Sequence, residues 1–219
     1  MMSIFNEMDE RLRNIEALKG DYFNESCILI FAYLDYLSNF TEKINKKGNN
    51  NHRENFRYFI KNYSNLESEL MCLQIDKFYN DYSINRNDEK NRYEHYFKRI
   101  ELLLDQVRKG QEVPLNKFFT LDDVDEIDKD YFKSYTIFNK IYDHRNFLIH
   151  EYRNNLDYGG VPISPFLSYT ENIQGGEGWF TCEVPYSFLR TLLLNCYTNV
   201  RKEYEKTMKI LSPLFLSHE

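Results

Sequence analysis

The chain has 219 residues, of which 42% are hydrophobic and 28% charged, and its formal net charge is −6 at pH 7. This composition is ordinary for a globular protein with one good core or two small ones. The negative charge argues against a general nucleic-acid coat protein, which would be basic over its surface, but it allows a small local phosphate site.

No segment has the pattern of a membrane or export signal. The N-terminal segment MMSIFNEMDERLRN lacks the apolar stretch of a signal peptide, and the longest apolar run, Cys27–Leu34, is too short to span a bilayer. The four cysteines are widely spaced and form no C-x-x-C pair, which favours reduced, buried thiols over a disulfide framework or a zinc site. We therefore expect a cytoplasmic protein without membrane contact.

Apolar residues recur at helical spacing through the first half of the chain. This periodicity predicts an amphipathic helix over 4–18 and a central core helix over 22–44. A third helix is expected over 53–63. Ser64 followed by Glu67 has the form of a capping box and should open a short helix that carries Leu70, Leu73, Ile75 and Phe78. A further helix is expected over 92–108.

The second half is predicted to hold two more long helices, over about 130–153 and from Pro185 to about Leu211. Between them, two short alternating pieces flank a turn-rich segment, which predicts a small β-hairpin inserted near residues 160–184. We found no repeat and no linker. The sequence thus predicts an all-α fold, a helical bundle with one inserted hairpin, as a single domain over 1–219.

An acidic run occupies residues 122–130. Its spacing matches no calcium loop and lacks the glycine of such a loop. We interpret it as a solvated loop or a helix start favoured by the helix dipole.

The segment from Tyr142 to Arg153 carries the residue types best suited to chemistry. Asn146, His150 and Arg153 follow an i, i+4, i+7 stripe and share one helix face, whereas Arg145 lies about 140° around a regular helix from His150. Histidine can accept and supply protons near neutral pH, and arginine grips phosphate oxygens with two donors. Asn146 can donate and accept, and could hold either His150 or the phosphate.

The segment Arg145-Asn146-Phe147-Leu148-Ile149-His150 resembles the signature of the HEPN superfamily, an Arg followed by four to six residues and a His on a late helix. The Asn directly after the Arg matches the common form of that signature, and Glu151 after the His matches its phrasing. The core helix around Cys27–Phe40, with Asp35 in its middle, resembles the long first helix of these proteins, and Phe56–Tyr63 is similar to their following short helix. The resemblance covers residues 22–63 and 135–153.

This resemblance implies a HEPN-type helical bundle that forms a homodimer, in which two Arg/His motifs meet in one composite cleft. Many such proteins are metal-independent ribonucleases of prokaryotic toxin–antitoxin, abortive-infection or CRISPR-linked defence. Arg145, His150 and Asn146 would then be catalytic, RNA the substrate, an antitoxin protein a possible partner, and no cofactor would be required. Because the helical geometry separates Arg145 from His150, we expect the dimer to complete the site.

Several alternatives stay open. Asp35 could pair with Arg145 or orient His150, or it could form a structural ion pair or occupy a partly exposed edge position. Arg153 could widen a phosphate-binding surface or pair with an acidic neighbour. The whole motif could belong to a non-catalytic HEPN module that binds a protein or nucleotide, or to an unrelated helical scaffold. No metal site is expected, because His144 and His150 lack a third ligand and a suitable register.

Overall fold

The structure is a computed structural model that describes residues 2–45, 51–84, 90–109, 119–151, 168–174 and 177–216. Most of these residues are helical. The only strands among these residues form one hairpin, so the all-α fold is confirmed. The chain divides into two compact units. Unit 1 comprises Met1–Glu67, Leu148–Tyr152 and Leu189–Glu219, and unit 2 comprises Ser68–Phe147 and Arg153–Phe188. The single domain expected over 1–219 stays a prediction.

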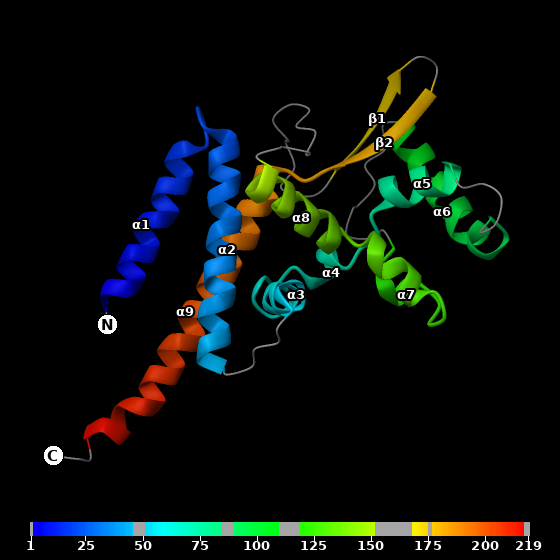
Figure 1. The fold of residues 1–219 in the computed structure, drawn as a ribbon. Helices are drawn as coiled ribbons and strands as arrows, with labels where there is room; N and C mark the ends of the chain where they lie inside the picture. Colours follow the sequence, from blue (N-terminus) through cyan, green and yellow to red (C-terminus); the bar gives the residue numbers. More distant parts are fainter. Residues whose placement is uncertain are drawn as a thin grey trace. The chain divides into compact units, whose positions relative to one another are not determined.

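Unit 1 contains helices α1 (Met2–Leu18), α2 (Phe23–Asn45), α3 (His52–Tyr63) and most of α9 (Tyr186–Leu216) (Figure 1). Their bounds confirm the helices predicted from periodicity, including the start of α9 directly after Pro185. Helix α2 packs against both α1 and α3. Its apolar residues Cys27, Ile30, Phe31, Leu34 and Leu37 have no exposed surface, as expected for a central core helix.

Polar side chains of α9 complete the C-terminal end of α3. The side-chain amides of Asn195 and Asn199 donate to the carbonyl oxygens of Ser64 and Tyr63, at 2.6 and 2.8 Å. One turn further, Glu203 accepts a hydrogen bond from the Tyr63 hydroxyl. The last carbonyls of a helix have no partner within the helix, so this polar stripe on α9 satisfies groups that would otherwise be costly to bury.

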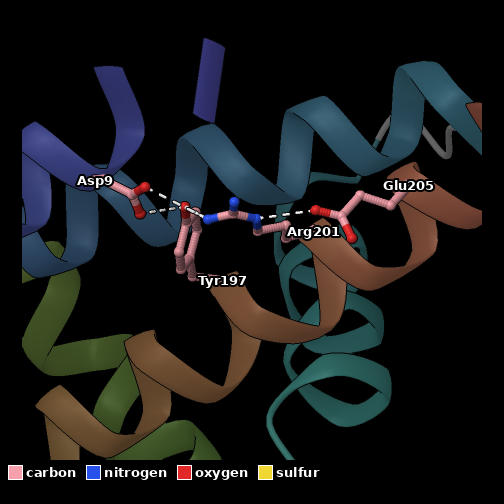
Figure 2. A network of polar contacts seen from close by, with 4 residues as sticks. All are labelled: Asp9, Tyr197, Arg201 and Glu205. Carbon is pink, nitrogen blue, oxygen red and sulfur yellow. Dashed lines mark hydrogen bonds and ion pairs between the residues drawn. The ribbon is translucent and has the colours of Figure 1, made fainter. Parts of the chain in front are cut away.

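A second polar network joins α1 to α9 (Figure 2). The Tyr197 hydroxyl donates to Asp9 at 2.5 Å, and the Arg201 guanidinium contacts Asp9 Oδ2 at 3.4 Å and the Tyr197 oxygen at 3.2 Å. Arg201 Nε also donates to Glu205 at 3.1 Å. The network supplements the apolar contacts that α1 makes through Phe5, Met8 and Ile15.

Unit 2 is built around an aromatic core. It contains α4 (Glu67–Leu70) from Ser68 onward, α5 (Ile75–Ile84), α6 (Lys90–Arg108), α7 (Lys129–Phe132), α8 (Ile137–Asn146) and two short 3₁₀ turns, Leu121–Asp123 and Lys133–Tyr135. Some of its ring pairs pack edge to face, as Phe78 and Tyr135 do, or stacked, as Tyr93 and Tyr131 do, which are arrangements that aromatic pairs prefer. The buried members of this core are Leu73, Ile75, Phe78, Tyr82, Tyr93, Tyr96, Ile100, Leu104, Phe119, Val124, Phe132 and Tyr135.

Two helices predicted as continuous are interrupted by the same tertiary contact. Leu73 and Thr136 form an antiparallel bridge, and the Ile137 N–H donates to the Cys72 carbonyl at 3.0 Å. The bridge needs extended backbone, and Thr136 has φ −82° and ψ 151°. The expected helix from Ser64 onward is therefore two helices, α4 and α5, and the expected helix over 130–153 is α7, a 3₁₀ turn and α8.

An inserted hairpin is confirmed in the predicted region, but its first strand lies later than the piece around Ile163–Tyr169 that the sequence indicated, and residues 172–174, expected in the turn, belong to that strand. Strand β1 (Ser168–Gln174) pairs antiparallel with β2 (Glu177–Glu183), from Ser168 opposite Glu183 to Gln174 opposite Glu177. Strand β2 packs against helix α5 (Figure 1). The hairpin is therefore a docked part of unit 2.

The acidic run contains one residue that is not solvated. Asp128 is buried, accepts from Arg92 Nε at 2.8 Å and from the Tyr96 hydroxyl at 3.3 Å, and so ties the run to helix α6. The interpretation as a solvated segment is wrong for Asp128, because a carboxylate with two donors at these distances can be buried.

Candidate functional site

The candidate motif begins on helix α8. The Thr136 hydroxyl accepts from the Asn139 N–H at 3.4 Å and caps the helix. Threonine suits this position because it tolerates the extended backbone of the bridge to Leu73 and also supplies the capping oxygen. The contact that interrupts the longer predicted helix thus also fixes where the motif-bearing helix starts.

The helix changes its hydrogen-bonding pattern inside the motif. Helix α8 ends at Asn146, and Phe147–Glu151 forms a π-helical turn. A π-helix closes i→i+5 hydrogen bonds and holds more residues per turn than an α-helix, and such turns are frequent at functional sites. The expected angle of about 140° between Arg145 and His150 assumed the 100° per residue of a regular helix. That assumption is wrong from Phe147 onward, because the backbone there is π-helical.

Arg145 and Asn146 are in direct contact. Arg145 Nη1 donates to Asn146 Oδ1 at 2.7 Å, and the guanidinium carbon lies 5.5 Å from the centroid of the Tyr142 ring. Both Arg145 and Asn146 are half-buried. The asparagine oxygen and the aromatic face restrict the conformations of a long cationic side chain, which stays partly exposed. Such an arrangement can present a fixed positive charge to an anion.

His144, the neighbour of this pair, is a core residue. It is 3% exposed, and burial, together with the positive charge of Lys140, lowers the pKa of its imidazole to about 4. It is therefore neutral at pH 7 and has almost no surface for a macromolecular substrate. His144 therefore does not suit the proton-transfer role, which the sequence analysis assigned to His150.

The other predicted site residues lie as follows. Asp35 is half-buried on α2 in unit 1. His150 and Glu151 belong to the π-helical turn and to unit 1, and their side chains lie outside the described residues, as does all of Arg153. The structure therefore brings Arg145 and Asn146 together, and the pairing of Asp35 with Arg145 or His150 stays a prediction.

A polar cluster that the sequence did not reveal lies in unit 2 and includes one residue of the helix that carries Arg145. Asp76 of α5 contacts Lys140 of α8 and the backbone of Cys182 in β2. The partners are 64 and 106 residues apart in the chain. No local spacing could have indicated this cluster, because α5 carries a second carboxylate, Asp81, and nothing in the sequence distinguishes Asp76 from it.

The cysteines behave as buried thiols. All four are free of disulfides and buried, and burial raises the pKa of the Cys72 thiol to about 11. In the parts of the chain that the structure describes, no three His, Cys, Asp or Glu side chains gather as a metal site would require. Within the same parts, no helix has the length and apolar character to cross a bilayer.

Comparisons with known proteins returned no match: no family model, curated protein or solved structure is similar to this chain. The resemblance to the HEPN superfamily accordingly rests on the residues of the sequence.

Proposed function

We propose that the chain is a metal-independent endoribonuclease of a prokaryotic defence or toxin–antitoxin type system. It acts in the cytoplasm as a homodimer, with a composite site that contains Arg145, Asn146 and His150. The observation that carries the proposal is the 2.7 Å hydrogen bond between Arg145 and Asn146, a half-buried pair at the end of α8 directly before a π-helical turn. Of the three polar residues of the HEPN-like motif, Arg145 and Asn146 are the two whose side chains the structure describes.

Arg145 binds the scissile phosphate in this account. Its guanidinium keeps a positive charge at any physiological pH and can donate two hydrogen bonds to phosphate oxygens. The bond to Asn146 Oδ1 and the Tyr142 ring support this role, because a restrained cation loses less conformational entropy when it binds an anion. Charge that develops on the phosphate in the transition state is then stabilised by a preorganised donor.

His150 transfers the protons. A neutral imidazole takes the proton of the substrate 2′-hydroxyl while that oxygen forms a bond to phosphorus. The bond from phosphorus to the 5′-oxygen breaks, and an imidazolium, supplied by the second His150 of the homodimer, protonates the leaving oxygen. The products are a 2′,3′-cyclic phosphate and a 5′-hydroxyl, with no metal ion and no cofactor required.

Three further residues have supporting roles in the proposal. Asp35 would orient or neutralise a group of the site, Glu151 would hold the motif in place, and Arg153 would extend the contact with the RNA backbone. An antitoxin protein would cover the site. A net charge of −6 fits a protein whose affinity for RNA comes from one local site and not from its whole surface.

Cleavage of RNA in the presence of EDTA tests the proposal. Wild type should cleave a mixture of structured and unstructured RNA, and His150→Ala and Arg145→Ala should each slow cleavage by about 100-fold or more. His52→Ala, at an exposed position on α3, is the matched histidine control and should cleave like wild type. If wild type and His150→Ala leave RNA equally intact, the catalytic proposal fails.

One observation favours a second candidate, a non-catalytic HEPN-like module that binds a protein partner or a nucleotide. The Arg145 guanidinium contacts Asn146 and Tyr142 of its own helix, an arrangement that also suits a binding site. If this candidate is right, wild type should retain a labelled nucleotide in a binding assay, Arg145→Ala should lose that binding, and neither protein should cleave RNA.

A further inference from the structure

The buried carboxylate of Asp76 joins three elements of unit 2. Asp76 lies in the first turn of α5 and is 5% exposed. Its Oδ2 atom lies 3.1 Å from the Lys140 ammonium of α8 and accepts a hydrogen bond of 2.9 Å from the Cys182 N–H of β2. The Lys140 side chain is itself 14% exposed. One oxygen atom therefore holds both the hairpin and helix α8.

The carboxylate has no alternative donor among the described residues. Its other oxygen, Oδ1, is buried there without a hydrogen-bond partner. A buried charge is costly unless it is paired and hydrogen-bonded. Because Lys140 and Cys182 share a single acceptor, the loss of one donor leaves the charge dependent on the other. The position of β2 and the position of α8 are thus energetically linked at this atom.

The link reaches the candidate site through helix α8. Lys140 lies one turn before His144, whose pKa it helps to lower, and five residues before Arg145. Lys140, Ile141 and His144 are held on the interior side of α8, at half-buried or buried positions. A rotation of the helix that withdrew Lys140 from Asp76 would also turn Arg145 and Asn146, since all of them stand on one rigid element.

We propose that Asp76 is a positioning residue that couples the β1–β2 hairpin to helix α8, so that displacement of the hairpin reorients the Arg145–Asn146 pair. The hairpin then has a role in the function: an RNA that moves it changes the geometry of the phosphate-binding arginine. The effect on RNA cleavage rests on the proposed function, whereas the coupling between hairpin and helix does not.

Hydrogen exchange of the full chain, read by mass spectrometry, measures the coupling. Lys140→Met changes only α8, yet it should speed exchange of the β2 amides about ten-fold or more, because it leaves the Asp76 charge with one donor. Asp76→Asn should speed exchange in both β2 and α8. Asp76→Glu, which keeps the charge, should restore exchange to within about three-fold of wild type. Lys133→Met, at an exposed lysine, and Asp81→Asn, on the same helix as Asp76, are the matched controls and should leave both segments unchanged.

The double variant Asp76→Asn/Lys140→Met keeps the test decisive if a single variant fails to fold. It buries no isolated charge and should fold even where the singles do not. Coupling is overturned if Lys140→Met leaves β2 exchange at the wild-type rate, or if the double variant is no better folded than the less stable single variant.

Cleavage assays on the same proteins test the positioning role. Asp76→Asn should lower kcat about ten-fold or more with little change in KM, whereas Asp76→Glu should recover most of the rate. If wild type cleaves RNA and Asp76→Asn cleaves at the same rate, the positioning claim is wrong even where exchange shows coupling. If wild type does not cleave RNA, the proposed function fails, and the exchange measurements still decide the coupling.

Discussion

Acid should destabilise this protein through His144, and the size of the effect follows from the burial of that residue. The imidazole is 3% exposed and has a folded-state pKa of about 4, against 6.5 for an unperturbed histidine. Because the folded-state pKa is the lower one, the unfolded chain binds a proton first as the pH falls. The stabilisation by neutral His144 is complete above pH 6.5 and is lost progressively as the pH falls from 6.5 to about 4.

The difference between the two pKa values sets the magnitude. Each unit of difference between the two pKa values corresponds to about 1.36 kcal/mol. The free energy of unfolding therefore falls by about 3 kcal/mol once the pH is below both pKa values. Between about pH 7.5 and about pH 4.5, most of that loss should appear, roughly 2.5 kcal/mol. That is a substantial fraction of the stability of an ordinary domain.

Urea denaturation at these two pH values measures the effect. Wild type should lose about 2 to 3 kcal/mol more than His144→Gln, which cannot titrate. Carboxylates elsewhere titrate in both proteins, so their contribution cancels in the comparison. His52→Gln, at an exposed histidine on α3, is the control and should lose as much as wild type. If His144→Gln retains the full pH dependence of wild type, the reasoning from burial is refuted.

Three other outcomes follow from side chains in the two cores. The Tyr33 hydroxyl is buried without a hydrogen-bond partner among the described residues, whereas the Tyr197 hydroxyl donates to Asp9. Tyr33→Phe should therefore leave the free energy of unfolding unchanged or raise it by up to about 1 kcal/mol. Tyr197→Phe should lower it by about 1.5 to 3 kcal/mol. Equal losses in urea denaturation would contradict this. Phe78→Ala, in the aromatic core of unit 2, should cost about 3 to 5 kcal/mol, and a loss below about 1 kcal/mol would mean that this core is not packed as described. Burial raises the pKa of the Cys196 thiol, so this cysteine should react with a thiol reagent at about pH 8 only after unfolding, and rapid reaction of the native protein would contradict its burial.

The parts of the fold that were predictable from the sequence are those in which one helix face determines the pattern. Helices α1, α2, α3, α6 and α9 carry apolar residues at a spacing that identifies the helix without its partners. The hairpin was predictable because a turn-rich segment separates two alternating pieces. The interruptions at Leu73 and Thr136 were not predictable, since each depends on a backbone contact with a segment 63 residues away in the chain.

The candidate site was predictable only as a set of residues. The neighbours Arg145 and Asn146 were identified from their order in the motif, and their hydrogen bond is a local contact. The burial of His144, Asp76 and Asp128 depends on elements that are distant in the sequence, so composition and spacing could not reveal it. The π-helical turn depends on backbone hydrogen bonds that a residue pattern does not specify, and it invalidates the regular-helix angle assumed for Arg145 and His150.

The chemical ends of the RNA fragments test the central proposal most directly. Attack by the 2′-hydroxyl, with proton transfer by His150 and charge stabilisation by Arg145, predicts fragments with a 2′,3′-cyclic phosphate and a 5′-hydroxyl, formed by wild type in EDTA. The His150→Ala protein, prepared in parallel, should produce none. Fragments with a 3′-hydroxyl and a 5′-phosphate, or the same fragments from His150→Ala, would contradict the account.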